Sequence, residues 1–200
     1  MVKLPEFPEL EFEETRHSYW LNGCRIPSVT TLMKPLSDDF YGTVDKEILE
    51  RAAKRGTAIH NSAENLVKFG IEDIDPEYGG YFEAFKKWWT DKKPVPFGTE
   101  RRTYHKILRY AGTSDMICAE NGNLTLVDYK TSSQVNEILC GVQLEGYDRA
   151  WETHGVRIED RVILHLDRSG CYHEYRFPRS IECWRVLSAL MTIRDYKNKF

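Results

Sequence analysis

The stretch YAGTSDMICAENGNLTLVDYKTSSQ, residues 110–134, contains two apolar segments separated by a short polar turn. We expect strands over 112–119 and 124–130, joined by the turn ENGN at 120–123. Because side chains alternate along a strand, Asp128 and Lys130 share one face and Tyr129 points to the other. Asp115 and Asp128 lie at similar distances from the turn, so pairing of the two strands brings both carboxylates to the same edge of the sheet.

Two carboxylates in one pocket repel each other unless a cation lies between them. Oxygen ligands with room for water suit Mg²⁺ or Mn²⁺. A nearby lysine supplies a fixed positive charge that can hold an attacking water or a phosphate oxygen. Asp115, Asp128 and Lys130 are therefore the parts needed to hydrolyse a phosphodiester. The structural alternative is a partly exposed salt bridge at a sheet edge.

Outside this stretch, the pattern alternates between helices and strands. Apolar periodicity predicts a hairpin over 10–32 with its turn at Asn22–Gly23, a strand over 99–110 and a pair of strands after residue 160, together with four helices: 44–69, 81–93, 134–153 and 180–196. This order predicts an α/β (α+β) domain with a mixed central sheet and helices on both faces. Within a single domain over 1–200, we expect a β-hairpin extension over 1–43, a helical region over 44–93 and a core over 94–200.

Further polar residues lie at spacings that can serve a site. His60 and Glu64 are four residues apart on one helix, and so are Gln143 and Tyr147 on another. An imidazole can bind Mn²⁺, and a Gln–Tyr pair can contact DNA. Each pair also has a structural interpretation, as a core histidine and as a polar helix edge. A further candidate, Glu100, stands beside Arg101 and Arg102 at the start of its expected strand.

Four motifs together resemble the PD-(D/E)XK nuclease superfamily: GTAIH (56–60), GTSD (112–115), LVDYKT (126–131) and QLEGY (143–147). Their order and separations are most similar to the RecB-type and phage-type exonuclease branch. The segment HSYWLNGCRIPSVTTLM, residues 17–33, resembles the N-terminal region of phage-encoded members. The resemblance covers residues 17–147 and implies a restriction-endonuclease-like core.

The resemblance also implies roles for individual residues. Asp115 and Asp128 match the two metal-binding carboxylates, and Asp128 stands where many relatives have Glu. Tyr129 matches the residue whose backbone carbonyl binds the metal, and His60 matches the histidine ligand on the helix. Lys130 matches the lysine that orients or activates water.

The other implied roles concern DNA and the surroundings of the metal. Gln143 and Tyr147 match the QxxxY pair, which is associated with DNA contact and support of the site. Glu64 and Glu100 are weaker acidic candidates. Independently of the resemblance, Arg101 and Arg102 are candidates for DNA binding because they belong to a basic stretch of the chain. Some RecB-type relatives hold an iron–sulfur cluster on four cysteines, but the five cysteines here lack that spacing, so we expect no cluster.

Composition limits the class of protein. The chain has 200 residues, 41% of them hydrophobic, and no apolar run long enough for a membrane span. Its N-terminus lacks a signal-peptide pattern, so we expect a cytoplasmic protein with no membrane partner. The net charge of −3 includes a basic block over 86–109, with eight basic and two acidic residues. This block is either a solvated surface or, together with Arg157, Arg161 and the C-terminal arginines, a track for DNA. Likewise Trp88, Trp89 and Tyr104 either stack on bases or belong to the core.

We therefore predict a Mg²⁺- or Mn²⁺-dependent deoxyribonuclease, with an exonuclease of phage or prophage DNA recombination, repair or processing as the leading hypothesis. Its expected partner is linear duplex or single-stranded DNA, and a homo-oligomer or a recombination protein is a further possible partner. The alternatives are a non-catalytic nucleic-acid-binding module of the same fold, a structure-specific endonuclease and a purely structural subunit.

Overall fold

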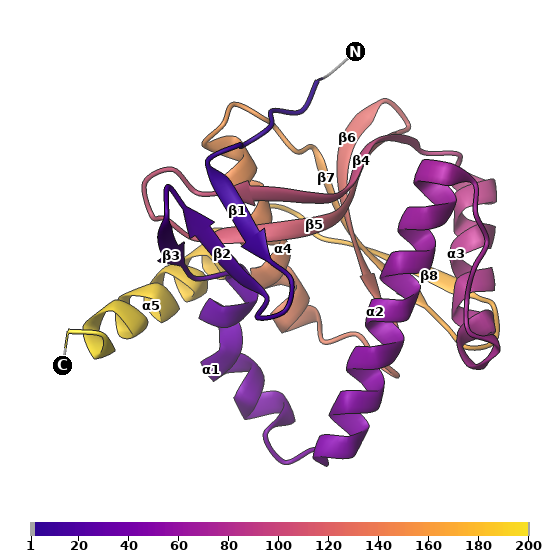
Figure 1. Cartoon of the computed structure of the whole chain (residues 1–200), viewed down its shortest axis with the longest axis horizontal. Coiled ribbons are helices and arrows are strands. Elements are labelled where there is room, and N and C mark those ends of the chain that lie inside the picture. Colours follow the sequence, from indigo (N-terminus) through magenta and orange to yellow (C-terminus); the bar gives the residue numbers. More distant parts are fainter. Residues whose placement is uncertain (1–2, 200) are drawn as a thin grey trace.

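A five-stranded sheet forms the centre of the molecule in the computed structural model, which describes residues 3–199 (Figure 1). The strands lie in sequence order, and all neighbours are antiparallel except β6 and β7, which are parallel. They are β4 (Val95–Tyr104), β5 (Ala111–Glu120), β6 (Asn123–Lys130), β7 (Asp160–Leu166) and β8 (Tyr172–Arg176). The mixed sheet expected from the sequence is confirmed.

Local sequence explains how β5, β6 and β7 are connected. Asn121 and Gly122 have φ angles of 52° and 86°, the positive values that a tight two-residue hairpin requires, and they join β5 to β6. The parallel pair β6–β7 needs a crossover, which is the helix α4 (Glu137–Glu152). The Asn136 side chain caps α4 by accepting the Leu139 N–H. A polar loop, 131–136, therefore separates the end of β6 from α4.

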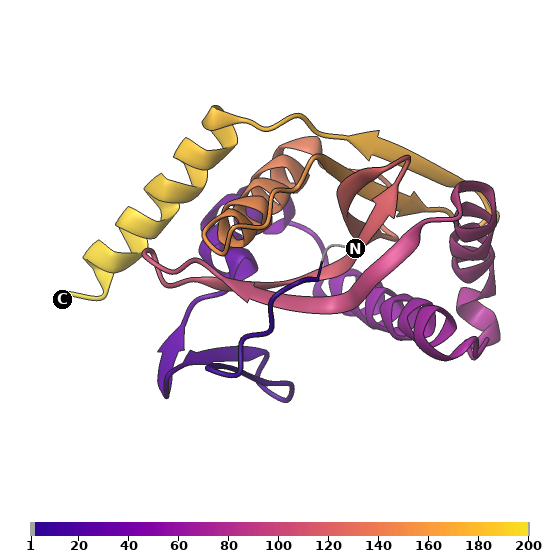
Figure 2. The same cartoon turned by 90° about the horizontal axis from the view of Figure 1, so that it is seen from above.

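Helices cover both faces of the sheet (Figure 2). On one face Ile117 packs with residues of α1 (Val29–Tyr41), α4 and α5 (Ile181–Lys197). On the other, Met116 and Cys118 pack with residues of α2 (Lys46–Phe69) and α3 (Gly79–Lys92), which the short helix η1 (Pro76–Tyr78) precedes. Successive residues of β5 thus bury alternate side chains in two separate cores. Within residues 3–199, no helix has the length and apolar character needed to cross a membrane.

A small second sheet precedes the main one, and here the sequence prediction was partly wrong. The antiparallel strands β1 (Leu10–Glu13), β2 (Ser18–Leu21) and β3 (Cys24–Ile26) include the expected turn at Asn22–Gly23. Residues 29–41, however, form helix α1 instead of the end of a hairpin extension over 1–43. The Ser28 hydroxyl accepts the Thr31 N–H as an N-cap, and Val29, Leu32 and Met33 are buried against the core. Capping and packing thus outweigh the strand preference of the β-branched run over 29–31.

Two other boundaries differ from expectation. The strand predicted over 99–110 ends at Tyr104, because the His105 ring accepts the Ile107 and Leu108 N–H groups and closes a turn over 105–110. The helix expected over 44–69 begins at Lys46 and runs without a break through Gly56, although glycine disfavours helix interiors. Trp88 is fully buried and its indole N–H donates to Glu174, so this tryptophan belongs to the core.

Candidate active site

Asp115 and Asp128 lie on neighbouring central strands. Met116 pairs with Val127 across β5 and β6, so the two aspartates are the next residues along this antiparallel ladder. Both are buried: Asp115 is 6% exposed and Asp128 is 2% exposed. Burying one carboxylate without a partner is costly, so two adjacent ones need compensating groups. Two different sets of residues supply them.

The first set surrounds Asp115 and comes from three elements. The Tyr129 backbone N–H donates to Asp115 Oδ2 at 2.6 Å, and His60 Nδ1 on α2 lies 3.3 Å from Asp115 Oδ1. Glu100, on β4, lies 3.8 Å from the same His60 nitrogen. One ligand atom from each of His60, Glu100 and Asp115 lies within 4.8 Å of the others. We call these three residues the histidine cluster.

Glu100 reaches this cluster through an unusual backbone conformation. Its φ angle is 49°, in the left-handed region, which costs a residue with a side chain about 1–2 kcal/mol. It lies opposite Asp115, between two paired positions of the β4–β5 ladder. Strained backbone of this kind concentrates at functional sites, where surrounding structure holds it in place.

The charges of the histidine cluster are strongly coupled. Burial lowers the pKa of the His60 imidazole, but the Asp115 carboxylate and then Glu100 outweigh it and raise that pKa to about 10. Burial by itself raises the pKa of Asp115. His60 and Lys130 outweigh this effect, so the pKa of Asp115 lies below its usual range. A negative field thus surrounds His60 Nδ1, and it favours a proton or a metal cation at that position.

The second set surrounds Asp128, and we call it the lysine cluster: Asp128, Lys130, Gln143 and Tyr147. The Lys130 ammonium forms an ion pair with Asp128 and donates to Gln143 Oε1 at 3.1 Å. The Gln143 amide nitrogen donates to Asp128 Oδ1 at 3.1 Å and to the Tyr147 hydroxyl at 2.9 Å. Asp128 and Lys130, which share one face of β6, therefore both contact Gln143 on α4. Tyr147, on the same face of α4, contacts Gln143 in turn.

The two aspartates have opposite pKa shifts. Burial raises the pKa of Asp128, Lys130 lowers it and Asp115 raises it, and the net direction is upward. Burial lowers the pKa of Lys130, but Asp128 and Asp115 raise it more, so the ammonium stays charged. Adjacent carboxylates with pKa values pushed apart are typical of sites that divide chemical roles between them.

Some predicted residues have other partners. Glu64 pairs with Lys68 and accepts the Thr99 hydroxyl at 3.4 Å, and it is not one of the three residues of the histidine cluster. Arg101 donates to the Pro5 carbonyl at 2.9 Å, and the Arg102 guanidinium lies 4.7 Å from the centre of the Phe12 ring. Both arginines therefore contact the N-terminal segment.

The basic block is also largely paired. Lys86 lies 2.8 Å from Glu72, and Lys92 lies 2.7 Å from Glu174. Arg161, expected on the same DNA track, is buried and forms an ion pair with Asp148. These contacts agree with the structural interpretation of the charge pattern.

Two residues beside the site were missed by the sequence analysis. Arg55 Nε donates to the Thr131 hydroxyl at 3.2 Å, and the guanidinium lies 5.1 Å from the centre of the Tyr81 ring. His165 pairs with Lys130 in the parallel ladder, and its Nε2 donates to the Ser132 carbonyl at 2.7 Å. Both hold the loop after Lys130. The only sequence signal for Arg55 was its place five residues before His60.

Comparisons with known proteins give limited information. No protein-family model and no curated protein matches the chain. Among solved structures, it is similar to an alkaline exonuclease (LHK-Exo) from Laribacter hongkongensis, with a TM-score of 0.44 and 11% identity over 68% of this chain and 79% of that one. The same exonuclease in complex with dAMP gives a TM-score of 0.42 and 14% identity, covering 72% and 87% of the two chains. SSO0001 gives a TM-score of 0.39 and 13% identity, covering 81% of this chain and 84% of that one. The case for a function therefore rests on the site itself.

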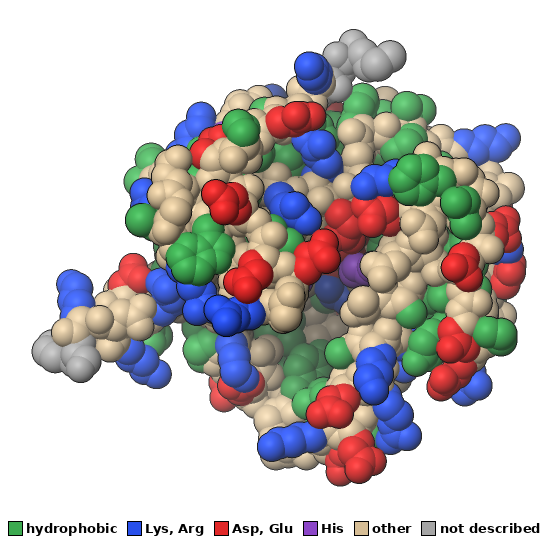
Figure 3. Space-filling model, viewed as in Figure 1, with side chains coloured by type: hydrophobic (Ala, Val, Ile, Leu, Met, Phe, Trp, Pro, Cys, Tyr) green, Lys and Arg blue, Asp and Glu red, His purple; other side chains and the backbone are tan. Residues whose placement is uncertain are grey.

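Cavities flank the two clusters on both sides. A cavity of about 340 Å³ has Glu64, Glu100, Arg101 and Arg102 in its lining. A second cavity, of about 640 Å³, reaches Lys130 and Gln143. Figure 3 shows a hollow between α1 and α2 with acidic side chains and a histidine at its rim.

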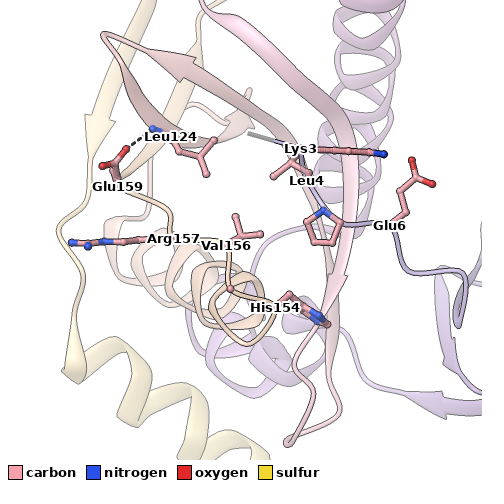
Figure 4. A pocket seen from close by; sticks show the side chains of 10 residues that line it. Lys3, Leu4, Glu6, Leu124, His154, Val156, Arg157 and Glu159 are labelled. Carbon is pink, nitrogen blue, oxygen red and sulfur yellow. Dashed lines mark hydrogen bonds between the residues drawn. The ribbon is translucent and has the colours of Figure 1, made fainter. Parts of the chain in front are cut away.

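A cavity of about 710 Å³ lies at the opposite end of β6, beside Leu124 (Figure 4). Its labelled Lys3 and Arg157 side chains point in opposite directions, with Leu4 and Val156 between them. Because no charged groups converge there, this cavity is a weaker candidate than the cavities beside the two clusters, despite its size.

Proposed function

We propose that this protein is a metal-dependent deoxyribonuclease that hydrolyses phosphodiester bonds at Asp115, Asp128 and Lys130. One observation carries the proposal: a three-residue histidine cluster and a lysine cluster lie side by side on two adjacent central strands. Structural ion pairs do not explain why two buried carboxylates are adjacent, or why Glu100 adopts a costly conformation to join them.

The donor set fits Mg²⁺ or Mn²⁺. His60, Glu100 and Asp115 offer one nitrogen and two carboxylate oxygens close together, and Mn²⁺ accepts both types. Asp128 and the Tyr129 backbone carbonyl, on the neighbouring strand, are the further ligands that the sequence resemblance suggested. When bound, such a cation polarises a phosphate oxygen and lowers the pKa of water. The raised pKa of His60 is consistent with this role, because a cation would replace the proton held there.

The protein residues position the reactants. In hydrolysis a water oxygen forms a new bond to phosphorus while one P–O ester bond breaks. The Lys130 ammonium stabilises the negative charge that develops on the phosphate and orients the attacking water. Gln143 fixes that ammonium by bridging Lys130 and Asp128, and Tyr147 fixes Gln143 in turn. Gln143 and Tyr147 are thus positioning residues.

We further propose that the enzyme degrades DNA from an end, in phage or prophage DNA recombination, repair or processing. Support comes from the four motifs in sequence order. A chain of net charge −3 gains little non-specific attraction to DNA, so its own charge contributes little to processivity. An oligomer or a recombination protein would supply it.

The test is DNA degradation on end-labelled linear duplex, linear single strand and closed circle, in Mg²⁺, in Mn²⁺ and with a chelator. We expect metal-dependent loss of linear DNA and no cleavage of the circle. Lys130→Ala should lower the rate by about 10²–10³-fold. Lys87→Ala, which removes a surface lysine paired with Asp91, is the matched control and should retain full activity.

Each alternative gives a different result. Cleavage of the closed circle would indicate an endonuclease. Degradation that persists in Lys130→Ala would place the activity elsewhere or in a contaminant. DNA binding without cleavage under any condition would indicate a non-catalytic nucleic-acid-binding module.

A further inference from the structure

Helix α5 lies at one side of the molecule, and its C-terminal half extends beyond the other elements (Figure 1, Figure 2). Its inner face packs on α1 and α4, with Leu187 and Met191 buried. The packing is close, because a Cβ added to Gly146 of α4 would come within 2.9 Å of Leu187 Cδ2. A Cβ added to Gly141 would come within 3.1 Å of Cys183 Sγ. The inner face is therefore held firmly against the body, which fixes the direction of the outer face.

The outer face of α5 carries a stripe of solvent-exposed apolar side chains. Val186 is 39% exposed and Ile193 is 47% exposed, and Ala189 between them is exposed as well. Their spacing of three and four residues places them along one line, about 150° around the helix from Leu187 and Met191. A helix with apolar residues on all sides is normally buried on all sides. The part of the chain that the structure describes leaves this stripe uncovered, which indicates a partner outside this molecule.

The two ends of the stripe carry opposite charges. Glu182 lies four residues before Val186, Lys197 lies four residues after Ile193, and both charged side chains are exposed. This spacing is the same from either end of the helix. An antiparallel copy of α5 therefore places each Val186 against an Ile193 and each Glu182 against a Lys197. Opposite charges attract at both ends of such a pair, and so do the antiparallel helix dipoles.

We propose that α5 pairs with the α5 of a second copy of this chain, antiparallel, about a twofold axis between Ala189 and Leu190. Such an interface is self-complementary, because the same surface of each copy contacts the same surface of the other. The small side chain of Ala189 beside the axis allows the two helices to approach closely. The assembly closes at two copies, since each stripe is covered by one partner.

The expected dimer is weak. A helix of 17 residues is about 25 Å long, so one pair of helices buries less surface than the interface of about 800 Å² per partner that is typical of stable complexes. We therefore expect a dissociation constant of about 10–100 µM. The inference stands apart from the proposed nuclease function, because neither the histidine cluster nor the lysine cluster has a residue on α5.

The test is sedimentation equilibrium of the full chain from about 2 to 200 µM, where we expect monomers in equilibrium with dimers. Ile193→Asp places a charge in the middle of the apolar contact and should raise the dissociation constant at least about tenfold. Ile48→Asp is the matched control, since it makes the same change at a helical isoleucine that is 52% exposed on α2. The control should associate like the wild type, and circular dichroism melts of both variants show whether each is folded.

Charge reversal tests the direction of the helices. Glu182→Lys alone places two lysines side by side at both ends of an antiparallel pair and should weaken association about fivefold. The double variant with Glu182→Lys and Lys197→Glu has opposite charges at both ends again, so association should return to the wild-type level. In a parallel pair each residue faces its own copy, and neither variant would differ from the wild type.

Three results would overturn the proposal: monomers throughout this concentration range, association that Ile193→Asp leaves unchanged, or a trimer or larger assembly, which this helix pair cannot form. A double variant as weak as the single one would overturn the antiparallel arrangement. Failure of the nuclease proposal is distinguishable, because it appears as absence of metal-dependent cleavage and leaves the sedimentation result unaffected.

Discussion

The histidine cluster and the lysine cluster lie side by side, but they balance the negative charge of their aspartates in different ways. In the histidine cluster, His60, Glu100 and Asp115 point their ligand atoms at one small region and leave its charge to be balanced by a proton or a cation. In the lysine cluster, Asp128 already has a permanent cation, Lys130, and Gln143 forms a hydrogen bond with each of them.

This difference separates two functions. A cluster with excess negative charge binds an exchangeable cation, whereas a cluster with a built-in ammonium keeps a fixed positive charge aimed at the substrate. The pKa of Asp115 is lowered because His60 and Lys130 outweigh its burial, whereas burial and the neighbouring Asp115 raise the pKa of Asp128 in spite of Lys130. Changes in the histidine cluster should therefore affect metal affinity first, and changes in the lysine cluster should affect the rate at saturating metal.

The largest effect is expected from Asp115→Asn. The substitution keeps the shape of the side chain but removes the charge that dominates the histidine cluster, so both metal binding and cleavage should be lost, with a rate decrease of about 10³-fold. The assays are Mn²⁺ titration by calorimetry and DNA degradation. Asp91→Asn, at an exposed ion pair on α3, is the control and should behave like the wild type. Retained Mn²⁺ affinity in Asp115→Asn would break the assignment of the cation to this cluster.

Glu100→Gln is expected to have a smaller and more selective effect. It removes one charge at the edge of the histidine cluster, so Mn²⁺ affinity should fall about 10–100-fold. Because the lysine cluster is untouched, cleavage at saturating Mn²⁺ should approach the wild-type rate. The measurement is the Mn²⁺ dependence of the cleavage rate. A lower rate that added metal does not restore would show that Glu100 acts beyond metal affinity.

Gln143→Leu should show the reverse pattern. Loss of the amide releases Lys130 from its bridge to Asp128, and the cleavage rate at saturating metal should fall about tenfold. Mn²⁺ affinity should stay within a few-fold of the wild type, which a general loss of folding would not allow. Steady-state kinetics across Mn²⁺ concentrations measures both quantities. An effect on Mn²⁺ affinity alone would contradict this assignment, because it would show that the lysine cluster sets metal affinity.

The smallest effect concerns stability against pH in the absence of metal. The pKa of His60 is raised in the folded protein to about 10, so the stability from its charged form is complete below about pH 6.5 and is lost as the pH rises toward 10. His60→Asn should lack this contribution, and its melting temperature should fall less over that range than that of the wild type. Thermal melts in a chelator at several pH values measure the difference. Equal slopes for the two proteins would show that His60 is not charged in the metal-free state.

Much of the lysine cluster could be predicted from the sequence because it depends on local rules. Strand alternation places Asp128 and Lys130 on one face, the ENGN hairpin aligns Asp115 with Asp128, and helix spacing aligns Gln143 with Tyr147. Helices on both sides of a mixed sheet also follow from the order of the periodic segments.

The rest depends on contacts between distant segments. The link between Arg55 and Thr131 joins residues 76 positions apart, and that between His165 and Ser132 joins residues 33 apart. The contact of Glu100 with His60 requires both the β4–β5 pairing and a positive φ angle. Helix α1 was missed because Val29, Thr30 and Thr31 favour a strand locally, and the cavity of about 640 Å³ that α1 lines was missed with it.

The most direct test of the account is a crystal structure of the protein soaked in Mn²⁺, with anomalous diffraction used to locate the metal. The result we expect is an anomalous peak within coordination distance of Asp115 and His60, with Lys130 still bridged to Gln143. A structure with no peak at these side chains under saturating Mn²⁺, or with Mn²⁺ bound only elsewhere, would contradict the assignment of a metal-dependent active site to the two clusters.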